Sequence, residues 1–391
     1  MMYATRWAQT WLAIGFLWFL VGIALSPSNK LYQQGLVVFL WLPTLVLIWS
    51  ARGRLVQLWN AQRALSISIL LMLAWTTSSL LWATGEEPGR ELKRLLYIAV
   101  FLLFFPLLAQ SGEQRLRQLM FCGGIGLAVA AVQSIVQFYL VRGEEWASRL
   151  YGIGEISHPI LGAYVIGAAM VWMIHWQPQT RLLQLLWSIS LLCLAAFLLL
   201  CQSRGAALGL LITLVAMPLW CRDRRSCLIA GVSLATAAVV FVVFYSMIMS
   251  RGASYRPEIF QVTLQMIAEH PWTGVGLGSF YTIMAAGAQF DHTHNMFTHI
   301  ALELGIPGML LWLSIWLCVL REIWKARDTT FGQGLMGLWL FSTLAMQFDA
   351  ASLTGTPRAE WFISWLPVGL ATVLVWVRAR APGCDKISGS I

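Results

Sequence analysis

The sequence predicts an all-α, polytopic integral membrane protein with about twelve transmembrane helices. Of its 391 residues, 59% are hydrophobic and only 11% are charged, whereas a soluble domain carries roughly a quarter charged residues. The mean hydropathy is +0.71. Apolar runs of about twenty residues, the length needed to cross a hydrocarbon core of roughly 30 Å, recur along the chain. Only helices satisfy their own backbone in lipid, so these runs predict membrane-spanning helices.

Twelve apolar runs define the expected helices. The fourth is short, and the long stretch 182–221 is divided at Gln202-Ser203-Arg204-Gly205, so the expected count is eleven to thirteen. We expect residues 1–391 to form a single membrane domain. The runs are 7–25, 31–50, 64–83, 95–109, 116–141, 159–176, 182–201, 205–221, 228–249, 296–320, 331–350 and 361–377.

The distribution of basic residues predicts the orientation. An even number of helices places both termini on one side, and a cytoplasmic placement puts 16 of the 26 Lys and Arg residues inside, as the positive-inside rule requires. The same topology puts 12 of the 17 acidic residues outside. The net charge of +9 therefore reflects membrane topology, and no nucleic-acid partner is expected.

The longest interruption of the membrane pattern is 250–295, between the ninth and tenth spans, and this topology places it outside. Pro257 favours a helix start, because its missing N–H costs nothing at the first position, and His270-Pro271 ends the helix. We expect a short amphipathic helix lying against the membrane surface or the bundle. Its predicted apolar stripe is Phe260, Thr263, Leu264 and Ile267.

The glycine-rich segment Gly274-Val275-Gly276-Leu277-Gly278 follows that helix. It lacks the spacing and the preceding strand of a dinucleotide fingerprint, so no nucleotide is expected. Glycines at alternate positions can form a nest of N–H groups for an anion, which makes Gly276 and Gly278 candidate substrate-binding residues. The alternative is a tight turn that returns the chain to the membrane.

The segment Asp291-His292-Thr293-His294-Asn295 stands at the mouth of the next span and admits three interpretations. A His-x-His pair beside a carboxylate can bind zinc, but no further pattern supplies an obvious closing ligand, so no metal is expected. Asn295 or Thr293 fits a helix cap. The favoured interpretation is a catalytic or substrate-binding imidazole, because histidine readily accepts a proton near neutral pH.

Two arginines complete the candidate site. Arg204, beside Ser203, interrupts about forty nearly continuous apolar residues, and a charge near membrane depth usually faces a cavity or a partner. Arg256 begins the amphipathic helix. Alternatively, Arg204 snorkels to the interface and Arg256 faces solvent or phospholipid. If both face one external cavity, they form a clamp suited to a pyrophosphate.

Other external loops contribute further candidate substrate contacts. Arg142 and His158 lie in the loop between the fifth and sixth spans, and Arg358 lies in the last external turn. Each of these residues taken singly also fits a solvated loop position.

The external segments resemble the bacterial O-antigen ligase and polymerase superfamily. Tyr255-Arg256-Pro257 and the stretch from Glu269 to Phe280 resemble the large external loop of that superfamily. His294-Asn295, followed after nine residues by Gly305-Ile306-Pro307-Gly308, matches the ligase-type signature. Gln202-Ser203-Arg204-Gly205 resembles the Ser-Arg element of the superfamily at an external helix entry.

The resemblance implies a fold similar to that of GT-C glycosyltransferases and an O-antigen ligase activity at the periplasmic face of a Gram-negative inner membrane. The donor would be a glycan on undecaprenyl pyrophosphate, and the acceptor a sugar hydroxyl of lipid A-core. By position, His294 is the catalytic histidine and Arg204 and Arg256 are the essential arginines, with Ser203, His292 and Asn295 as further substrate contacts. Neither a metal nor a nucleotide cofactor is implied.

Two other functions compete with this hypothesis. An O-antigen polymerase shares the expected fold and donor, and the His294-Asn295 spacing favours the ligase over it. A transporter of lipid-linked sugars would need charges or broken helices near the bilayer midplane and repeated halves. The chain shows no clear internal repeat, and Asp349, near a span end, is the residue that a transporter would have to use.

Overall fold

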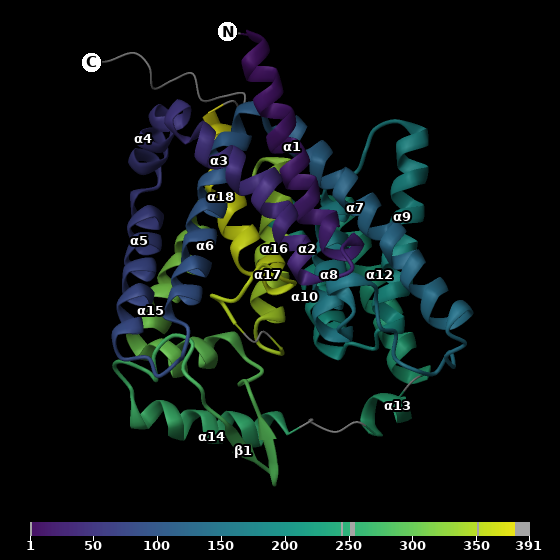
Figure 1. The fold of residues 1–391 in the computed structure, drawn as a ribbon. Helices are drawn as coiled ribbons and strands as arrows, with labels where there is room; N and C mark the ends of the chain where they lie inside the picture. Colours follow the sequence, from purple (N-terminus) through teal and green to yellow (C-terminus); the bar gives the residue numbers. More distant parts are fainter. Residues whose placement is uncertain (1, 244, 251–254, 350–351, 380–391) are drawn as a thin grey trace.

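The computed structural model describes residues 2–243, 245–250, 255–349 and 352–379, and these form a bundle of long helices running side by side (Figure 1). Within these ranges, nine helices are long and apolar enough to cross a membrane. Two shorter apolar helices, Pro159–His175 and Trp365–Arg378, stand among them. The expected all-α, multi-pass membrane fold is confirmed.

The N-terminal part of the bundle extends to the segment that precedes α8. Its elements are α1 (Met2–Leu25), α2 (Asn29–Leu36), η1 (Val37–Trp41), α3 (Leu42–Leu47), η2 (Ile48–Ala51), α4 (Arg52–Ala61), α5 (Arg63–Ser78), η3 (Ser79–Leu81), α6 (Pro88–Leu108), η4 (Ala109–Ser111), α7 (Glu113–Ile135), η5 (Val136–Val141) and η6 (Gly154–Ile156).

The remaining elements include the large loop and the C-terminal helices. They are α8 (Pro159–His175), α9 (Arg181–Leu200), α10 (Arg204–Ala216), α11 (Pro218–Cys221), α12 (Arg224–Val243), α13 (Tyr245–Ser250), α14 (Arg256–Glu269), β1 (Ile283–Ala285), β2 (Ala288–Phe290), α15 (Met296–Lys325), α16 (Thr330–Ala345), α17 (Glu360–Ile363) and α18 (Trp365–Ala379).

Each of the twelve predicted runs contains helical structure, although residue 244 of the ninth run and residue 350 of the eleventh lie outside the described residues. The long stretch 182–221 is divided where the sequence predicts, because α9 ends at Leu200 and α10 begins at Arg204. The fourth run is longer than expected. Its helix, α6, begins at Pro88, where a proline is favoured, and Arg94 pairs with Glu91 within its polar first turns.

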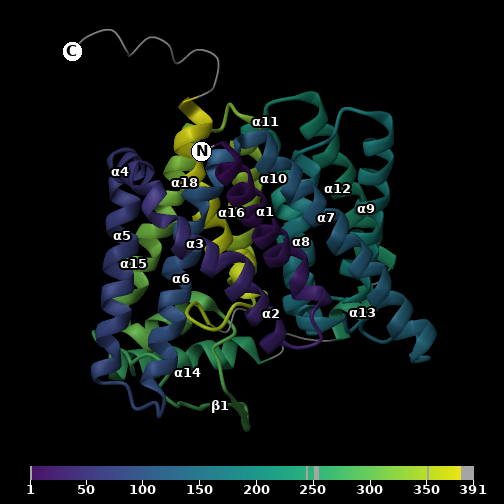
Figure 2. The same ribbon diagram turned by 45° about the horizontal axis from the view of Figure 1, so that its top comes forward.

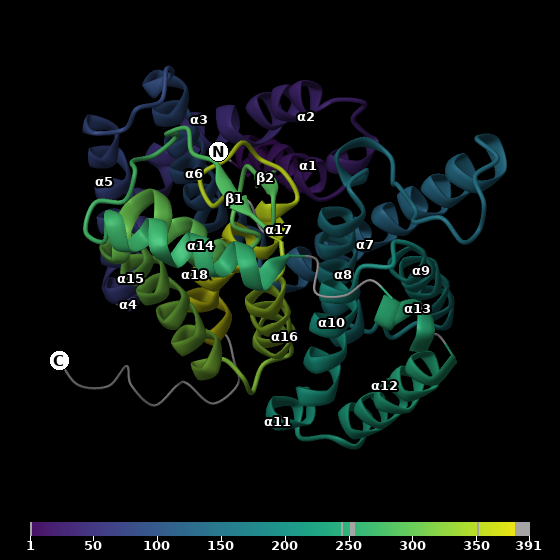
Figure 3. The ribbon, with the colours of Figure 1, turned by 90° about the horizontal axis from the view of Figure 1, so that it is seen from below.

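The connecting elements lie at two opposite ends of the bundle. In Figure 2, α4, α11 and the start of α1 lie at one end, and α14 and β1 lie at the opposite end. The basic loops that the sequence places in the cytoplasm therefore lie at the end opposite the large loop. In Figure 3, seen from the end that carries α14, this helix lies across α15.

The large loop contains the expected helix with a different buried face. α14 begins at Arg256 and ends at Glu269, as predicted. Its buried residues are Ile259 and Thr263, whereas Phe260 and Leu264 are 45% and 47% exposed. The predicted stripe is therefore right at Thr263, which is buried, and at Ile267, which is partly buried, but wrong at Phe260 and Leu264. The reason is the β1–β2 hairpin, which the sequence did not predict and whose Ile283 packs against Ile259.

A break in α15 determines how the large loop attaches. Gly305 has φ 70° and ψ −179° within the helix, a conformation open essentially only to glycine. Carbonyls on the N-terminal side of the break then accept hydrogen bonds from Val275 and Gly276 of the loop and from the Trp75 indole. The break at Gly305, the first residue of the Gly-x-x-Gly element, thus lets the large loop attach to the bundle by backbone hydrogen bonds.

Candidate active site

A cavity of about 320 Å³ lies at the end of the bundle that carries the large loop, and it collects the principal predicted residues. Its polar lining comes from the loop before α8, the start of α10, the start of α14, the entry to α15 and the segment after α16. The polar residues include Arg149, Ser203, Arg204, Arg256, His294 and Asp349. The two predicted arginines and the predicted histidine therefore face one cavity, although they lie far apart in the sequence.

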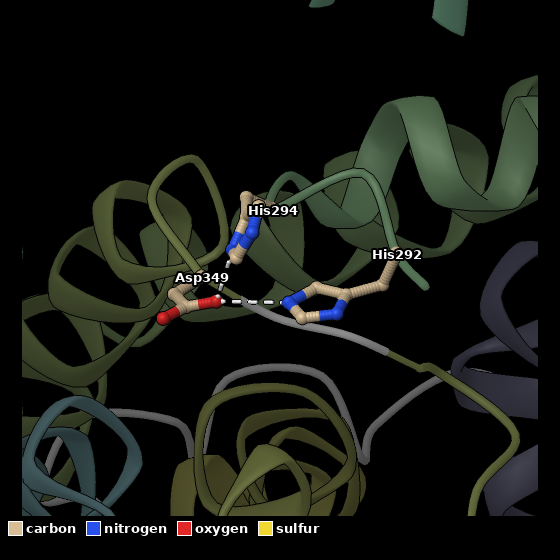
Figure 4. Close-up of side chains that lie close together, drawn as sticks. All are labelled: His292, His294 and Asp349. Atoms are coloured by element: carbon tan, nitrogen blue, oxygen red, sulfur yellow. Dashed lines mark hydrogen bonds and ion pairs between the residues drawn. The ribbon is translucent and has the colours of Figure 1, made fainter. Parts of the chain in front are cut away.

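Asp349 orients the imidazole of His294. Nδ1 of His294 lies 2.8 Å from Oδ1 of Asp349, whose side chain is 7% exposed. Figure 4 shows His292 converging on the same carboxylate. A carboxylate at Nδ1 holds the proton on that nitrogen and leaves the lone pair of Nε2 free to accept a proton. The arrangement is therefore suited to general-base chemistry at Nε2.

His292 lies between two carboxylates. Its Nδ1 is 2.6 Å from Asp291 Oδ1, and its Nε2 is 3.3 Å from Asp349 Oδ1. Burial lowers the pKa of His292, but the hydrogen bonds to Asp349 and Asp291 outweigh burial, so the net pKa is raised. Burial likewise raises the pKa of Asp349, and the bonds from His292 and His294 reverse this and hold it well below its usual range. The cluster therefore keeps Asp349 ionised.

Arginine side chains make the cavity electropositive. Nε of Arg256 donates to the carbonyl of Phe348, 3.1 Å away, next to Asp349. Nε of Arg149 donates to the carbonyl of Cys201, also at 3.1 Å, so the loop before α8 is fixed to the end of α9. Arg204 is the first residue of α10. Three guanidinium groups face one carboxylate here, and planar guanidinium groups bind phosphate oxygens bidentately.

Two buried hydroxyls in the cavity lack partners within the described part of the chain. They belong to Ser203, which is 3% exposed, and to Tyr164, which is fully buried. Ser203 precedes α10, yet its side chain makes no capping bond. Buried polar groups are nearly always satisfied, and these two hydroxyls keep hydrogen-bonding capacity toward the cavity that they line.

Backbone strain accompanies the site residues. Gln202, Tyr255 and His294 have φ values of 50°, 58° and 54°, in the left-handed region that non-glycine residues seldom adopt. The first two directly precede Ser203 and Arg256, and the third is the candidate base. Such strain tends to cluster where the surrounding structure must aim a side chain.

Comparison with known proteins identifies the family of the chain. A family model described as O-antigen ligase matches residues 189–313, the segment from α9 into α15 that includes Arg204, Arg256 and His294. An O-antigen ligase of Pseudomonas aeruginosa PAO1 is 30% identical over 377 residues, which cover 94% of this chain and 91% of that protein. The chain belongs to the O-antigen ligase family.

Asn295 caps a helix in this member of the O-antigen ligase family. Its Oδ1 accepts hydrogen bonds from the N–H groups of Phe297 and Thr298, at 2.9 and 3.1 Å. Its Nδ2 donates to the side chain of Gln347 at 2.9 Å. The geometry matches the capping interpretation of Asn295 and fixes the residue that follows His294.

The glycine-rich loop lies outside the cavity. A Cβ at Gly276 would lie 2.6 Å from Cα of Ala83, and one at Gly278 would lie 3.0 Å from Cγ of Glu91. The N–H of Gly276 is already bonded to the carbonyl of Glu303. These glycines allow close packing of backbone, and the neighbouring carboxylate of Glu91 disfavours an anion. The tight-turn interpretation fits this geometry better than the anion nest.

The three remaining predicted contacts do not line the cavity. Arg142 lies in an adjoining cavity of about 580 Å³, which it shares with Arg149. His158 caps α8, and its Nδ1 accepts from the N–H of Leu161 at 3.3 Å. Arg358 is exposed and lies 3.8 Å from Glu155.

The contacts of Asp349 with His292 and His294 also bring together three side chains that could ligate a metal. The ligand atoms of His292, His294 and Asp349 lie within 4.8 Å of one another, and two imidazoles with a carboxylate suit zinc. Asp349 supplies the closing ligand that sequence spacing did not reveal. The same geometry equally serves to orient His294, and that role needs no ion.

Sequence reasoning did not single out Arg149 and Tyr164, two polar residues that line the cavity. Arg149 lies in the same loop as Arg142 and His158 and fits a solvated loop position, and Tyr164 stands inside an apolar run. Asp349 was noted only as a group that a transporter would need. The available signal for Asp349 was a carboxylate at the predicted external end of a span, which is a costly place for a charge without a partner.

Proposed function

We propose that the protein ligates O-antigen polysaccharide from undecaprenyl pyrophosphate to a sugar hydroxyl of lipid A-core during lipopolysaccharide synthesis. The observation that carries the proposal is the cavity in which Arg204, Arg256 and His294 meet. Family membership supports the class of reaction. The reaction is placed at the periplasmic face of the bacterial inner membrane, with both termini in the cytoplasm.

The arginines act on the donor. Cleavage of the anomeric C–O bond leaves both electrons on the pyrophosphate, so negative charge builds up there. Arg204 and Arg256 stabilise that charge by charge-assisted hydrogen bonds. Arg149 lines the same cavity and adds a third positive charge. The leaving group is already activated, so the transfer itself requires no nucleotide.

His294 acts on the acceptor. The acceptor oxygen attacks the anomeric carbon opposite the leaving pyrophosphate, and its proton passes to Nε2 of His294. Asp349 balances the positive charge that the imidazole acquires, through the 2.8 Å contact at Nδ1. A single displacement of this kind inverts the anomeric configuration. Positioning of both substrates in line supplies much of the rate enhancement.

A reconstituted assay tests the proposal. Purified protein is mixed with lipid-linked glycan and lipid A-core in the presence of a chelator and without nucleotide. Formation of glycan-bearing lipid A-core is the expected result. His294→Ala, Arg204→Ala and Arg256→Ala are expected to abolish transfer while remaining inserted and folded. Full transfer by His294→Ala would contradict the role of the base.

Deletion in cells distinguishes the ligase from the polymerase. Loss of a ligase leaves full-length polymer on undecaprenol and no capped lipopolysaccharide. Accumulation of single repeat units would instead identify a polymerase and refute the proposed reaction.

A further inference from the structure

A second polar cavity of about 360 Å³ lies beside the candidate active site. It is bounded by the turn between η3 and α6, the loop 277–281 and the first turns of α15. Asp291, whose carboxylate contacts His292, lines this second cavity. Ser352, three positions beyond Asp349, lines it as well. The contacts from Asp291 through His292 to Asp349 therefore connect the linings of the two cavities.

A buried histidine with an unsatisfied nitrogen faces the second cavity. His299 is 5% exposed, and its Nδ1 lies 2.8 Å from the hydroxyl of Tyr281. Its Nε2 is 3.3 Å from Glu303 Oε2, but it makes no hydrogen bond within the described ranges. A buried ring nitrogen without a hydrogen bond is unfavourable for folding, so Nε2 of His299 is available to bond a ligand in the cavity.

Two largely buried carboxylates face the same space. Glu91 and Glu303 are 8% and 9% exposed. One oxygen of Glu91 contacts Nη1 of Arg94 at 2.5 Å, and one oxygen of Glu303 faces His299. Each carboxylate can accept several hydrogen bonds, so both retain acceptor capacity toward the cavity. Burial of carboxylates is tolerated when they are paired, and these two keep one partner each while still facing the cavity.

Charge distinguishes the two cavities. The second cavity is lined by five carboxylates and two arginines. Both arginines are paired with carboxylates of the same lining: Arg90 with Glu87 and Arg94 with Glu91. A phosphate would be repelled here, whereas sugar hydroxyls donate to carboxylates readily. The first cavity has the opposite character, with three arginines and one aspartate.

An exposed aromatic ring stands at the rim. Phe280 lines the second cavity and is 77% exposed. Small-molecule sites commonly combine an apolar or aromatic surface with a few convergent polar groups, and a ring face can cover the C–H face of a pyranose.

We propose that the second cavity binds a phosphate-free saccharide unit of the acceptor, next to the sugar whose hydroxyl reacts at His294. This proposal rests on the glycosyl transfer proposed above. Glu91, Glu303 and His299 hydrogen-bond the saccharide hydroxyls, and Phe280 packs on its apolar face. The first cavity then holds the donor and the second holds part of the acceptor, and the cluster of His292, His294 and Asp349 lies between them.

Steady-state kinetics with both substrates varied test the assignment. Phe280→Ala and Glu303→Gln are expected to raise KM for lipid A-core by about 3- to 10-fold, the effect of losing one net contact, while KM for the donor changes less than about twofold. Phe280→Trp restores the aromatic surface and should restore acceptor KM. Glu145→Gln, an exposed carboxylate that lines neither cavity, is the matched control.

A binding experiment separates this assignment from the proposed reaction. The probe is the core oligosaccharide freed from lipid A, titrated into the full-length protein in detergent. Phe280→Ala should weaken its binding and Arg204→Ala should not. If the wild type transfers glycan but Phe280→Ala and Glu303→Gln leave acceptor KM and oligosaccharide binding unchanged, the assignment is wrong and the reaction stands. If the wild type transfers nothing, the reaction fails, whereas weaker oligosaccharide binding by Phe280→Ala would still support the saccharide site.

Discussion

Nδ1 of His294 lies 2.8 Å from Oδ1 of Asp349, although 55 positions separate the two residues. His294 begins the approach to α15, and Asp349 follows the end of α16. Helices α15 and α16 are neighbours in the bundle, and the N–H of Met296 bonds to the carbonyl of Met346. Packing of these two helices therefore brings the carboxylate of Asp349 to Nδ1 of the candidate base.

Asp349→Asn is expected to reduce kcat by about 100-fold or more, because an amide at this position no longer stabilises the protonated imidazole or fixes its tautomer. Steady-state assays with both substrates varied provide the measurement, and KM for the donor should change little. Asp328→Asn, an exposed position beyond α15, is the control. An Asp349→Asn variant with wild-type kcat would exclude the orienting role.

Arg256→Ala is expected to lower kcat/KM by roughly 100- to 1000-fold, the loss typical of a donor to developing charge. Its Nε contact with Phe348 is a single bond at the rim, so the fold should survive. The control is Lys30→Ala, which removes an exposed charge from α2. Equal losses in both variants would indicate a general charge effect and not a specific contact with the leaving group.

Much of the fold could be predicted from the sequence, because a long apolar run in a membrane satisfies its backbone hydrogen bonds by forming a helix. The division at Ser203 and the start of α14 at Arg256 followed from local chemistry: a charged interruption and a proline at the first helical position. The buried face of α14 was not accessible. It depends on Ile283, which belongs to a short hairpin formed around positive-φ residues Ala286 and Gly287.

The candidate site was only partly predictable for a related reason. His294, Arg204 and Arg256 each carry a local signal. Their convergence on one cavity depends on how the helices pack, which the sequence does not show. Asp349 carries almost no local signal, since its role exists only because α16 ends beside the entry to α15. Gly276 and Gly278 carried a weak local signal that fitted either an anion nest or a tight turn, and their close packing against Ala83 and Glu91 favours the turn.

His292 is expected to make stability depend on pH. Its pKa is raised in the folded protein by Asp349 and Asp291 against the effect of burial. A group of this kind stabilises the fold below its ordinary pKa of about 6.5, and the contribution is lost as the pH rises through the raised pKa. The Tm difference between wild type and His292→Gln should therefore be larger at pH 5.5 than at pH 9, measured in detergent with a chelator present. A difference that grows with pH would contradict the assigned direction.

Gly305→Ala is expected to destabilise the protein by about 2 kcal/mol or more. A Cβ there would lie 2.6 Å from the carbonyl of Trp272, at a φ of 70°, and strain of this type costs on the order of 1–3 kcal/mol before any clash. Thermal unfolding in detergent measures the effect. Gly231→Ala is the control of opposite sign, since a Cβ at Gly231 in α12 meets nothing within 4 Å and should stabilise the helix by about 0.5–1 kcal/mol. Equal Tm shifts would mean that the break in α15 carries no special strain.

Variants of Asn295 distinguish a helix-capping role from a substrate-binding role. Its Oδ1 accepts from the N–H groups of Phe297 and Thr298, and aspartate performs the same function at a helix start. Asn295→Asp is therefore expected to keep Tm and transfer activity close to wild type, whereas Asn295→Ala should lose about 1 kcal/mol of stability and lower kcat, because the backbone of His294 is no longer anchored. If Asn295→Asp instead loses activity at wild-type Tm, the amide contacts the substrate, and the cap is the lesser part of its role.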